Sequence, residues 1–105
     1  MDPPAPDIPV NYEAVSRAYY RIRSGIHKTP CVRSKFLSEL CHAEIYLKKD
    51  LEQETGSFKE RGARNALMLL SEEDRNRGVV AASAGNHALA LAWHGRDLGV
   101  PVTVI

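Results

Sequence analysis

The sequence is poor in three features that mark whole classes of protein: long apolar runs, an excess of charge of one sign, and cysteine. Its longest uninterrupted apolar stretch, residues 88–93, is far shorter than the roughly 18 residues that a membrane-spanning helix needs. The 14 basic and 13 acidic residues leave a formal net charge of +1, without the basic excess of nucleic-acid-binding proteins. We therefore expect neither a membrane nor a nucleic acid among its partners.

The low cysteine content indicates in which cellular compartment the protein is located. The two cysteines, Cys31 and Cys41, are too few for a disulfide scaffold, and no Asn-x-Ser/Thr glycosylation acceptor occurs. These absences favour a reducing, cytoplasmic location. The hydrophobic share of 44% and the charged share of 26% are those of an ordinary globular chain, which excludes disorder throughout.

The first ten residues differ in composition from the rest. Four of the six prolines, and no lysine or arginine, fall within residues 1–9, which is unlike a signal peptide or an arginine-rich transit peptide. We expect a flexible arm over residues 1–10, followed by one domain, or part of one, over residues 11–105.

Apolar residues at helical spacing predict a helix over residues 12–24, with Asn11 as its N-cap and Gly25 as its stop. The apolar face of this helix is formed by Val15, Ala18, Tyr19 and Ile22. The following segments are predicted as a turn or extended crossing at 27–30, a short helix at 35–42, a strand at 45–48, a loop at 49–56, a helix at 58–70 that buries Ala63, Ala66, Leu67 and Leu70, and a short capped turn at 71–77.

The C-terminal part of the chain has the pattern of strand, helix and strand, over residues 79–82, 87–98 and 102–105. Such a unit predicts parallel strands with a right-handed crossover, and therefore an α/β fold with a doubly wound, mostly parallel sheet. Ligands of such sheets bind beyond the carboxyl ends of several strands. Because the chain stops within the second strand, we expect a fragment, truncated before much of that crevice; a complete domain with a fraying last strand is the alternative.

The first segment with candidate chemistry is ETGSFKERGARN at residues 54–65. Ser57 and Glu60 have the spacing of a capping box, in which each side chain accepts a hydrogen bond from the other residue's backbone N–H. Lys59 then lies in the first turn of a helix, whose positive end favours the neutral, nucleophilic amine that Schiff-base chemistry needs. An ordinary solvated lysine is also compatible with this spacing.

The second segment is ASAGNHA at residues 82–88, between the carboxyl end of a strand and the start of a helix. Free N–H groups at that place favour an anion such as a carboxylate or a phosphate, and Ser83 and Asn86 can add side-chain hydrogen bonds. A plain turn, with an unusual φ at Gly85 and Asn86 as N-cap, is the alternative.

Other side chains have simpler interpretations. His87 and His94 could share a helix face, but no third ligand has zinc-site spacing, so we expect no metal site. Trp93 is expected in the core. Phe58 is compatible with an ordinary place in the core as well.

Taken together and in this order, TGSFKERGA at residues 55–63 and SAGNHA at residues 83–88 are specific. The pair resembles the amino-terminal part of pyridoxal-phosphate enzymes of the tryptophan synthase β-like fold (fold type II). Within that group it is most similar to the threonine and serine dehydratases and to serine racemase. The resemblance implies that residues 11–105 are the amino-terminal part of such an enzyme domain, with pyridoxal 5'-phosphate as cofactor.

Carried over by position, the resemblance gives Lys59 the role of the lysine that bonds to the cofactor and later moves the substrate's α-proton. Phe58 and Asn86 would contact the cofactor, Asn86 at its 3'-oxygen. The substrate carboxylate would be held by the turn made of Ser83, Ala84, Gly85, Asn86 and His87.

The implied activity is that of a threonine or serine ammonia-lyase, which releases ammonia and gives 2-oxobutanoate or pyruvate. The family's glycine-rich phosphate loop would lie beyond Ile105, so we expect the isolated chain to be inactive; the full-length enzyme would be a homo-oligomer. Ala84 stands where serine racemase has its proton-donating serine, which favours the lyase. The alternatives are a serine racemase-like enzyme and a non-catalytic remnant that docks on a full-length relative.

Overall fold

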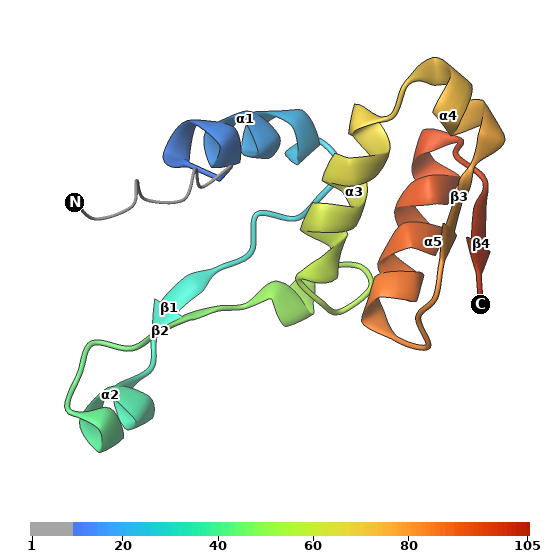
Figure 1. Cartoon of the computed structure of the whole chain (residues 1–105). Coiled ribbons are helices and arrows are strands. Elements are labelled where there is room, and N and C mark those ends of the chain that lie inside the picture. Colours follow the sequence, from blue (N-terminus) through green and yellow to red (C-terminus); the bar gives the residue numbers. More distant parts are fainter. Residues whose placement is uncertain (1–9) are drawn as a thin grey trace, which may run out of the picture.

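The structure is a computed structural model, and it describes residues 10–105. The predicted arm falls outside this range except for Val10, which is exposed. Helices and strands alternate along the chain, as predicted for an α/β fold (Figure 1). In chain order the elements are α1 (Tyr12–Ile22), β1 (Cys31–Arg33), α2 (Lys35–Cys41), β2 (Tyr46–Lys48), the 3-10 turn η1 (Asp50–Glu52), α3 (Lys59–Leu69), α4 (Glu72–Arg77), β3 (Val79–Ala81), α5 (Asn86–Leu98) and β4 (Val102–Val104).

The predicted strand–helix–strand unit is confirmed. Strands β3 and β4 pair in parallel, with Val79 opposite Val102, and α5 makes the crossover. The helix lies very close to the strands at Gly95, where a Cβ would overlap Cγ2 of Val102 and lie 2.8 Å from the carbonyl oxygen of Val100. Glycine is therefore required at this crossing.

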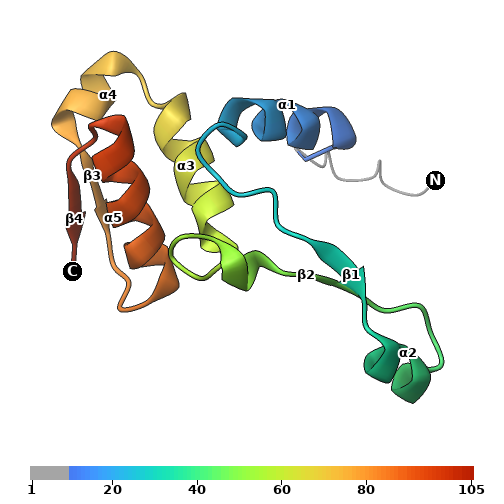
Figure 2. The same cartoon turned by 180° about the vertical axis from the view of Figure 1, so that it is seen from behind.

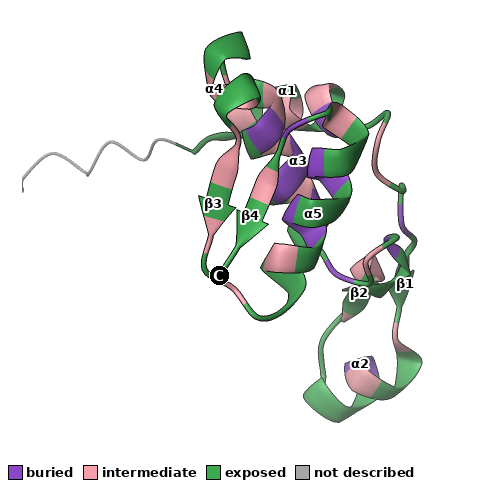
Figure 3. Cartoon of the chain, turned by 90° about the vertical axis from the view of Figure 1, so that its right-hand side faces the viewer, coloured by how far each residue is buried: buried purple, intermediate pink, exposed green. Residues whose placement is uncertain are grey.

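The core lies between α3 and α5. Ala63 and Leu67 of α3 contact Ala90 and Leu91 of α5, with Val100 closing one end. Figure 3 shows buried segments on both α3 and α5. Burial of a leucine side chain such as that of Leu67 stabilises the fold by about 2 kcal/mol.

Helix α1 lies beside α3 (Figure 2), and the two are joined by a hydrogen bond of 2.6 Å from Arg21 Nη1 to Asn65 Oδ1. Asn11 caps α1 as predicted, because its side chain accepts from the backbone N–H of Ala14. The helix ends at Ile22, two residues before the predicted end, and Ile22 alone of its predicted apolar face is buried.

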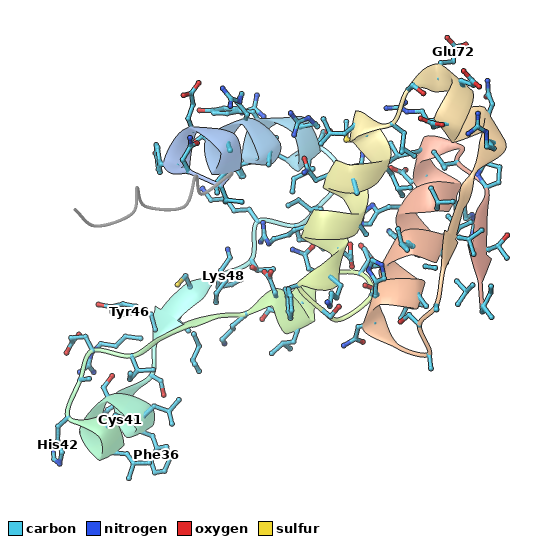
Figure 4. The ribbon with its side chains drawn as sticks, in the orientation of Figure 1. Phe36, Cys41, His42, Tyr46, Lys48 and Glu72 are labelled. Atoms are coloured by element: carbon cyan, nitrogen blue, oxygen red, sulfur yellow. The ribbon has the colours of Figure 1, made fainter. Side chains whose placement is uncertain are left out.

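An antiparallel hairpin of β1 and β2 carries α2 away from the rest of the chain (Figure 1). The sequence pattern predicts β2 but not β1, because Cys31 and Val32 are neighbouring apolar residues and show no alternation. Figure 4 shows Phe36, Cys41 and His42 around α2 at its far tip. Phe36 and Leu40 are 72% and 65% exposed, since no described element covers this helix.

Two packing expectations are wrong. Ala66 is exposed, because the buried face of α3 is formed by Glu60, Ala63, Arg64 and Leu67. Trp93 is 44% exposed and not a core residue. Within residues 10–105, none of the helices is both long and apolar enough to cross a bilayer.

Candidate active site

The two segments singled out in the sequence lie at the same end of the molecule. The carboxyl ends of β3 and β4 and the first turns of α3 and α5 all lie at the lower end of these elements in Figure 1. This is the edge of a parallel sheet at which α/β proteins bind ligands. Lys59 and residues 83–87 therefore share one end of the α3–α5 pair.

Lys59 is the first residue of α3, and its side chain is exposed. Its Nζ lies 5.5 Å from the centroid of the Phe58 ring, and that ring is itself 64% exposed. Phe58 is therefore not a core residue. The amine and the ring together form an accessible surface at the start of the helix.

The predicted capping box is wrong. Ser57 Oγ does accept a hydrogen bond, of 3.3 Å, but from the backbone N–H of Lys59. Glu60 does not reach back to Ser57: its carboxylate is fully buried and accepts from the N–H and the hydroxyl of Thr55 at 2.6 and 2.8 Å. The acid turns inward because a partner on α5, His94, is available there.

A polar cluster joins α3 to α5, and it is composed of the buried residues Glu60, Arg64 and His94 and the exposed Asp97. His94 Nε2 lies 3.0 Å from Glu60 Oε1, and His94 Nδ1 lies 3.2 Å from Arg64 Nη1, which also donates to Asp97. Burial lowers the pKa of His94 despite the nearby Glu60. The hydrogen bond from Arg64 lowers the pKa of Asp97. Sequence reasoning missed this cluster, although the i, i+4 spacing of Glu60 and Arg64 was a signal.

The turn at residues 83–87 is capped by Ser83. Its Oγ accepts from the backbone N–H groups of Gly85 and Ala88, both at 3.3 Å. Asn86 is the first helical residue and not the N-cap, and Gly85 has a φ of −138°, which any residue adopts. Within the part of the chain that the structure describes, the backbone N–H groups of Asn86 and His87 have no hydrogen-bond acceptor. They remain available to an anion.

A shallow hollow of about 480 Å³ opens beside this turn. It is lined by Ala84, Gly85, Asn86, Ala88, Leu89, Ala92 and Val104. Ser83, His87 and Lys59 are not in its lining, and among residues 10–105 no hydrogen bond or ion pair joins Lys59 to the turn. The fold thus brings the two segments to one edge without direct contact.

The hydrogen bonds of Glu60 to Thr55 are one anchor of the loop before Lys59, and a second anchor lies at Asp50. Asp50 of η1 accepts two hydrogen bonds from Arg61 of α3, at 2.8 and 3.0 Å, and a third from Thr29. The Arg61 guanidinium holds the pKa of the Asp50 carboxyl well below its usual range. No group of three potential metal ligands occurs among the described residues.

The sequence of residues 22–105 matches the family described as "Pyridoxal-phosphate dependent enzyme". The chain belongs to this family. Its members depend on pyridoxal phosphate, and the fold is that of fold type II.

Two relatives and one solved structure show how similar the chain is to individual members of the family. The chain is 46% identical over 96 residues to the L-threonine ammonia-lyase of Thermotoga maritima, covering 91% of this chain and 24% of that protein. It is 42% identical over 99 residues to the catabolic L-threonine dehydratase of Escherichia coli, covering 94% of this chain and 30% of that protein. It superposes on the crystal structure of serine racemase from Dictyostelium discoideum with a TM-score of 0.84 and 41% identity, covering 90% of this chain and 31% of that one. The chain thus spans less than a third of the length of these relatives.

The donor set fits the family's cofactor. Lys59 offers a primary amine that can bond to an aldehyde, with the accessible ring of Phe58 beside it. At the same edge, Asn86 offers an exposed amide, and the start of α5 offers N–H groups for a negatively charged oxygen.

Proposed function

We propose that this chain provides the lysine and the substrate-carboxylate turn of a pyridoxal-phosphate-dependent ammonia-lyase that acts on threonine or serine. The observation that carries the proposal is the common position of the exposed Lys59 and of residues 83–87 at one edge of the sheet. The similarity to threonine dehydratases over nine-tenths of the chain supports the reaction class.

Each proposed residue has a distinct task. Lys59 would hold the cofactor through its amine, and the same amine, once released, would take the α-proton of the amino acid. Phe58 would pack beside the cofactor ring, and the Asn86 amide would bind its 3'-oxygen. The bound cofactor supplies an electron sink for the carbanion.

The substrate is oriented by its carboxylate. In this proposal the carboxylate binds residues Ser83 to His87, with Ser83 shaping the turn through its two accepted hydrogen bonds. The substrate would lose its α-proton and its β-hydroxyl as water, and hydrolysis of the released enamine, after tautomerisation to the imine, would free ammonia and supply the oxo oxygen of 2-oxobutanoate from threonine or of pyruvate from serine. The methyl group of Ala84 carries no proton that it can donate, which supports elimination over racemisation.

A chimera tests this function. Residues 22–105 would replace the matching segment of the Escherichia coli dehydratase, and threonine-dependent 2-oxobutanoate would be measured. We expect activity in the chimera and its loss, by roughly 10²-fold or more, in Lys59→Ala, because a positioned base contributes at least that much. Lys49→Ala is the matched control and should retain activity. An active Lys59→Ala chimera would contradict the assignment.

A second candidate is a non-catalytic role by docking on a full-length relative. The Cα radius of gyration is 17.3 Å, whereas a compact domain of about 100 residues has one of about 13 Å. Ile105 is 82% exposed, and Phe36 is 72% exposed. Such open apolar surface is typical of a site that contacts another protein. Co-elution of the purified chain with a full-length relative in gel filtration tests this candidate.

We also propose a cytoplasmic location for the protein. Cys31 and Cys41 are both exposed free thiols, which supports a reducing compartment such as the cytoplasm. We also propose that the whole enzyme assembles as a homo-oligomer.

A further inference from the structure

A carboxylate without access to solvent lies directly behind Lys59. Glu60, the next residue, is fully buried, and each of its two oxygens is hydrogen-bonded. Oε2 accepts from Thr55, at the beginning of the loop that leads to Lys59, and Oε1 contacts His94 on α5. A buried carboxylate is costly unless its hydrogen bonds are satisfied. The loop from Thr55 to Lys59 is therefore held against α5 by one side chain.

The direction of each hydrogen bond in the cluster is determined by chemistry. Arg64 can only donate, so Nδ1 of His94 must accept from it. The ring proton then resides on Nε2 and is donated to Glu60. Glu60, with two acceptor oxygens, meets donors on both sides: Thr55 and His94. Only one arrangement of protons is compatible with these hydrogen bonds, while Nε of Arg64 is buried without a partner among the described residues.

Stability alone does not account for such a cluster. Apolar residues of similar volume usually stabilise a core as well as, or better than, buried charged groups. Hydrogen bonds that allow a single arrangement of protons do something that apolar packing does not: they specify one relative position of the two elements they join. Here those elements are α3, which begins with Lys59, and α5, which begins at the 83–87 turn.

We propose that Glu60 and His94 form a positioning pair, which fixes the loop before Lys59 and thereby directs the Lys59 amine toward the edge that carries residues 83–87. The pair acts through Lys59 and does not touch the reacting atoms. This inference rests on the function proposed for Lys59.

Three variants of near-constant size separate hydrogen bonding from packing. Glu60→Gln places an amide NH₂ opposite either His94 or the two donors of Thr55, so at least one bond is lost. His94→Gln keeps both bonds, because its amide can donate to Glu60 and accept from Arg64. His94→Leu removes both. Glu73→Gln, which alters only an exposed ion pair with Arg77 on α4, is the matched control.

Two measurements are made, the first on the purified chain and the second on the chimera with the Escherichia coli dehydratase. The first is hydrogen exchange of the Thr55 backbone amide, which needs no cofactor. The second is the share of label on Lys59, relative to the other lysines, after the active chimera is mixed with pyridoxal 5'-phosphate and reduced with borohydride. Thermal unfolding of each variant identifies any that fails to fold. If His94→Leu does not fold, Glu60→Gln alone is used to test the proposal.

We expect exchange at Thr55 to rise roughly tenfold or more in Glu60→Gln and His94→Leu, because a buried donor or acceptor loses its partner. The preference of the label for Lys59 should fall in the same two variants. His94→Gln and Glu73→Gln should match the wild type in both measurements.

Unchanged exchange in Glu60→Gln would overturn the proposed tie. Faster exchange with an unchanged preference for Lys59 would overturn the positioning of the amine, while the proposed function would stand. If the wild type is labelled mainly on another lysine, the proposed function fails and the positioning of the amine fails with it. Equal losses in His94→Gln and His94→Leu would assign the effect to packing.

Discussion

The guanidinium of Arg61 meets the carboxylate of Asp50 through two hydrogen bonds, of 2.8 and 3.0 Å. The pair joins η1 to the first turn of the α-helix that begins with Lys59, and the Asp50 side chain is only 12% exposed. Two anchors thus hold the loop between these elements, one through Asp50 and one through Glu60.

Replacing one partner of this pair should destabilise the chain. In Asp50→Asn the charge that meets Arg61 is lost, and we expect the free energy of unfolding to fall by about 2 kcal/mol. Because the pKa of Asp50 is lowered in the folded state, its contribution is present above about pH 4 and is lost as the pH falls further. Urea unfolding between pH 7 and pH 3 should show a smaller acid loss in Asp50→Asn than in the wild type. Glu44→Gln, in an exposed ion pair with Arg33, should change stability far less.

His94 gives a second pH dependence at higher pH. Burial lowers its pKa in the folded state, so the unfolded chain binds a proton first, near its ordinary value of about 6.5. Stability from the neutral ring is therefore complete above that pH and is lost as the pH falls toward the lowered value. The thermal midpoint should fall between pH 7 and pH 5 in the wild type and by less in His94→Gln. Identical pH profiles would show that His94 does not titrate differently on unfolding.

Two glycine substitutions should have opposite effects. A Cβ on Gly25 would overlap the guanidinium of Arg64, which cannot move freely because it is buried and bonded to His94 and Asp97. Gly25→Ala should therefore destabilise the chain by about 1–3 kcal/mol. A Cβ added at Gly62, inside α3, would meet no neighbouring element within 4 Å, so Gly62→Ala should stabilise by up to about 1 kcal/mol. Chemical denaturation of both variants checks the signs.

Ala84 should decide between two fates of the substrate carbanion. In the active chimera, Ala84→Ser adds a hydroxyl that can donate a proton, and we expect D-serine formed per pyruvate to rise, by roughly 10²-fold if the hydroxyl is well placed. Chiral chromatography of the products measures this ratio. An unchanged ratio, or efficient racemisation with alanine at this position, would show that another residue controls the outcome.

The predictable parts of the fold are those with local signals. Glycines and apolar runs mark the boundaries of the parallel unit of β3, α5 and β4, and Asn11 marks the start of α1. The hairpin strand β1 escapes prediction because its partner, β2, lies more than ten residues away and its own three residues show no alternation. Pairing of that kind depends on contacts that a local pattern does not contain.

The candidate site shows the same division. Lys59 and the 83–87 turn can be singled out from short motifs, and both lie at the predicted sheet edge. The role of Glu60 cannot, because its spacing to Ser57 fits a capping box equally well and only the packing of α3 on α5 brings His94 within 3.0 Å. Sequence spacing identifies which residues can cap a helix, whereas burial decides which one does.

The close approach at Gly95 has a consequence for motion. Because α5 lies against β4 with no room for even a methyl group, that helix and its strand can shift only as one body. The interface between α3 and α5 is formed by side chains, among them those of Ala63, Leu67, Ala90 and Leu91. Any widening or narrowing of the edge that carries Lys59 and the 83–87 turn must therefore be a sliding of one helix past the other, at the surface that Glu60 and His94 bridge.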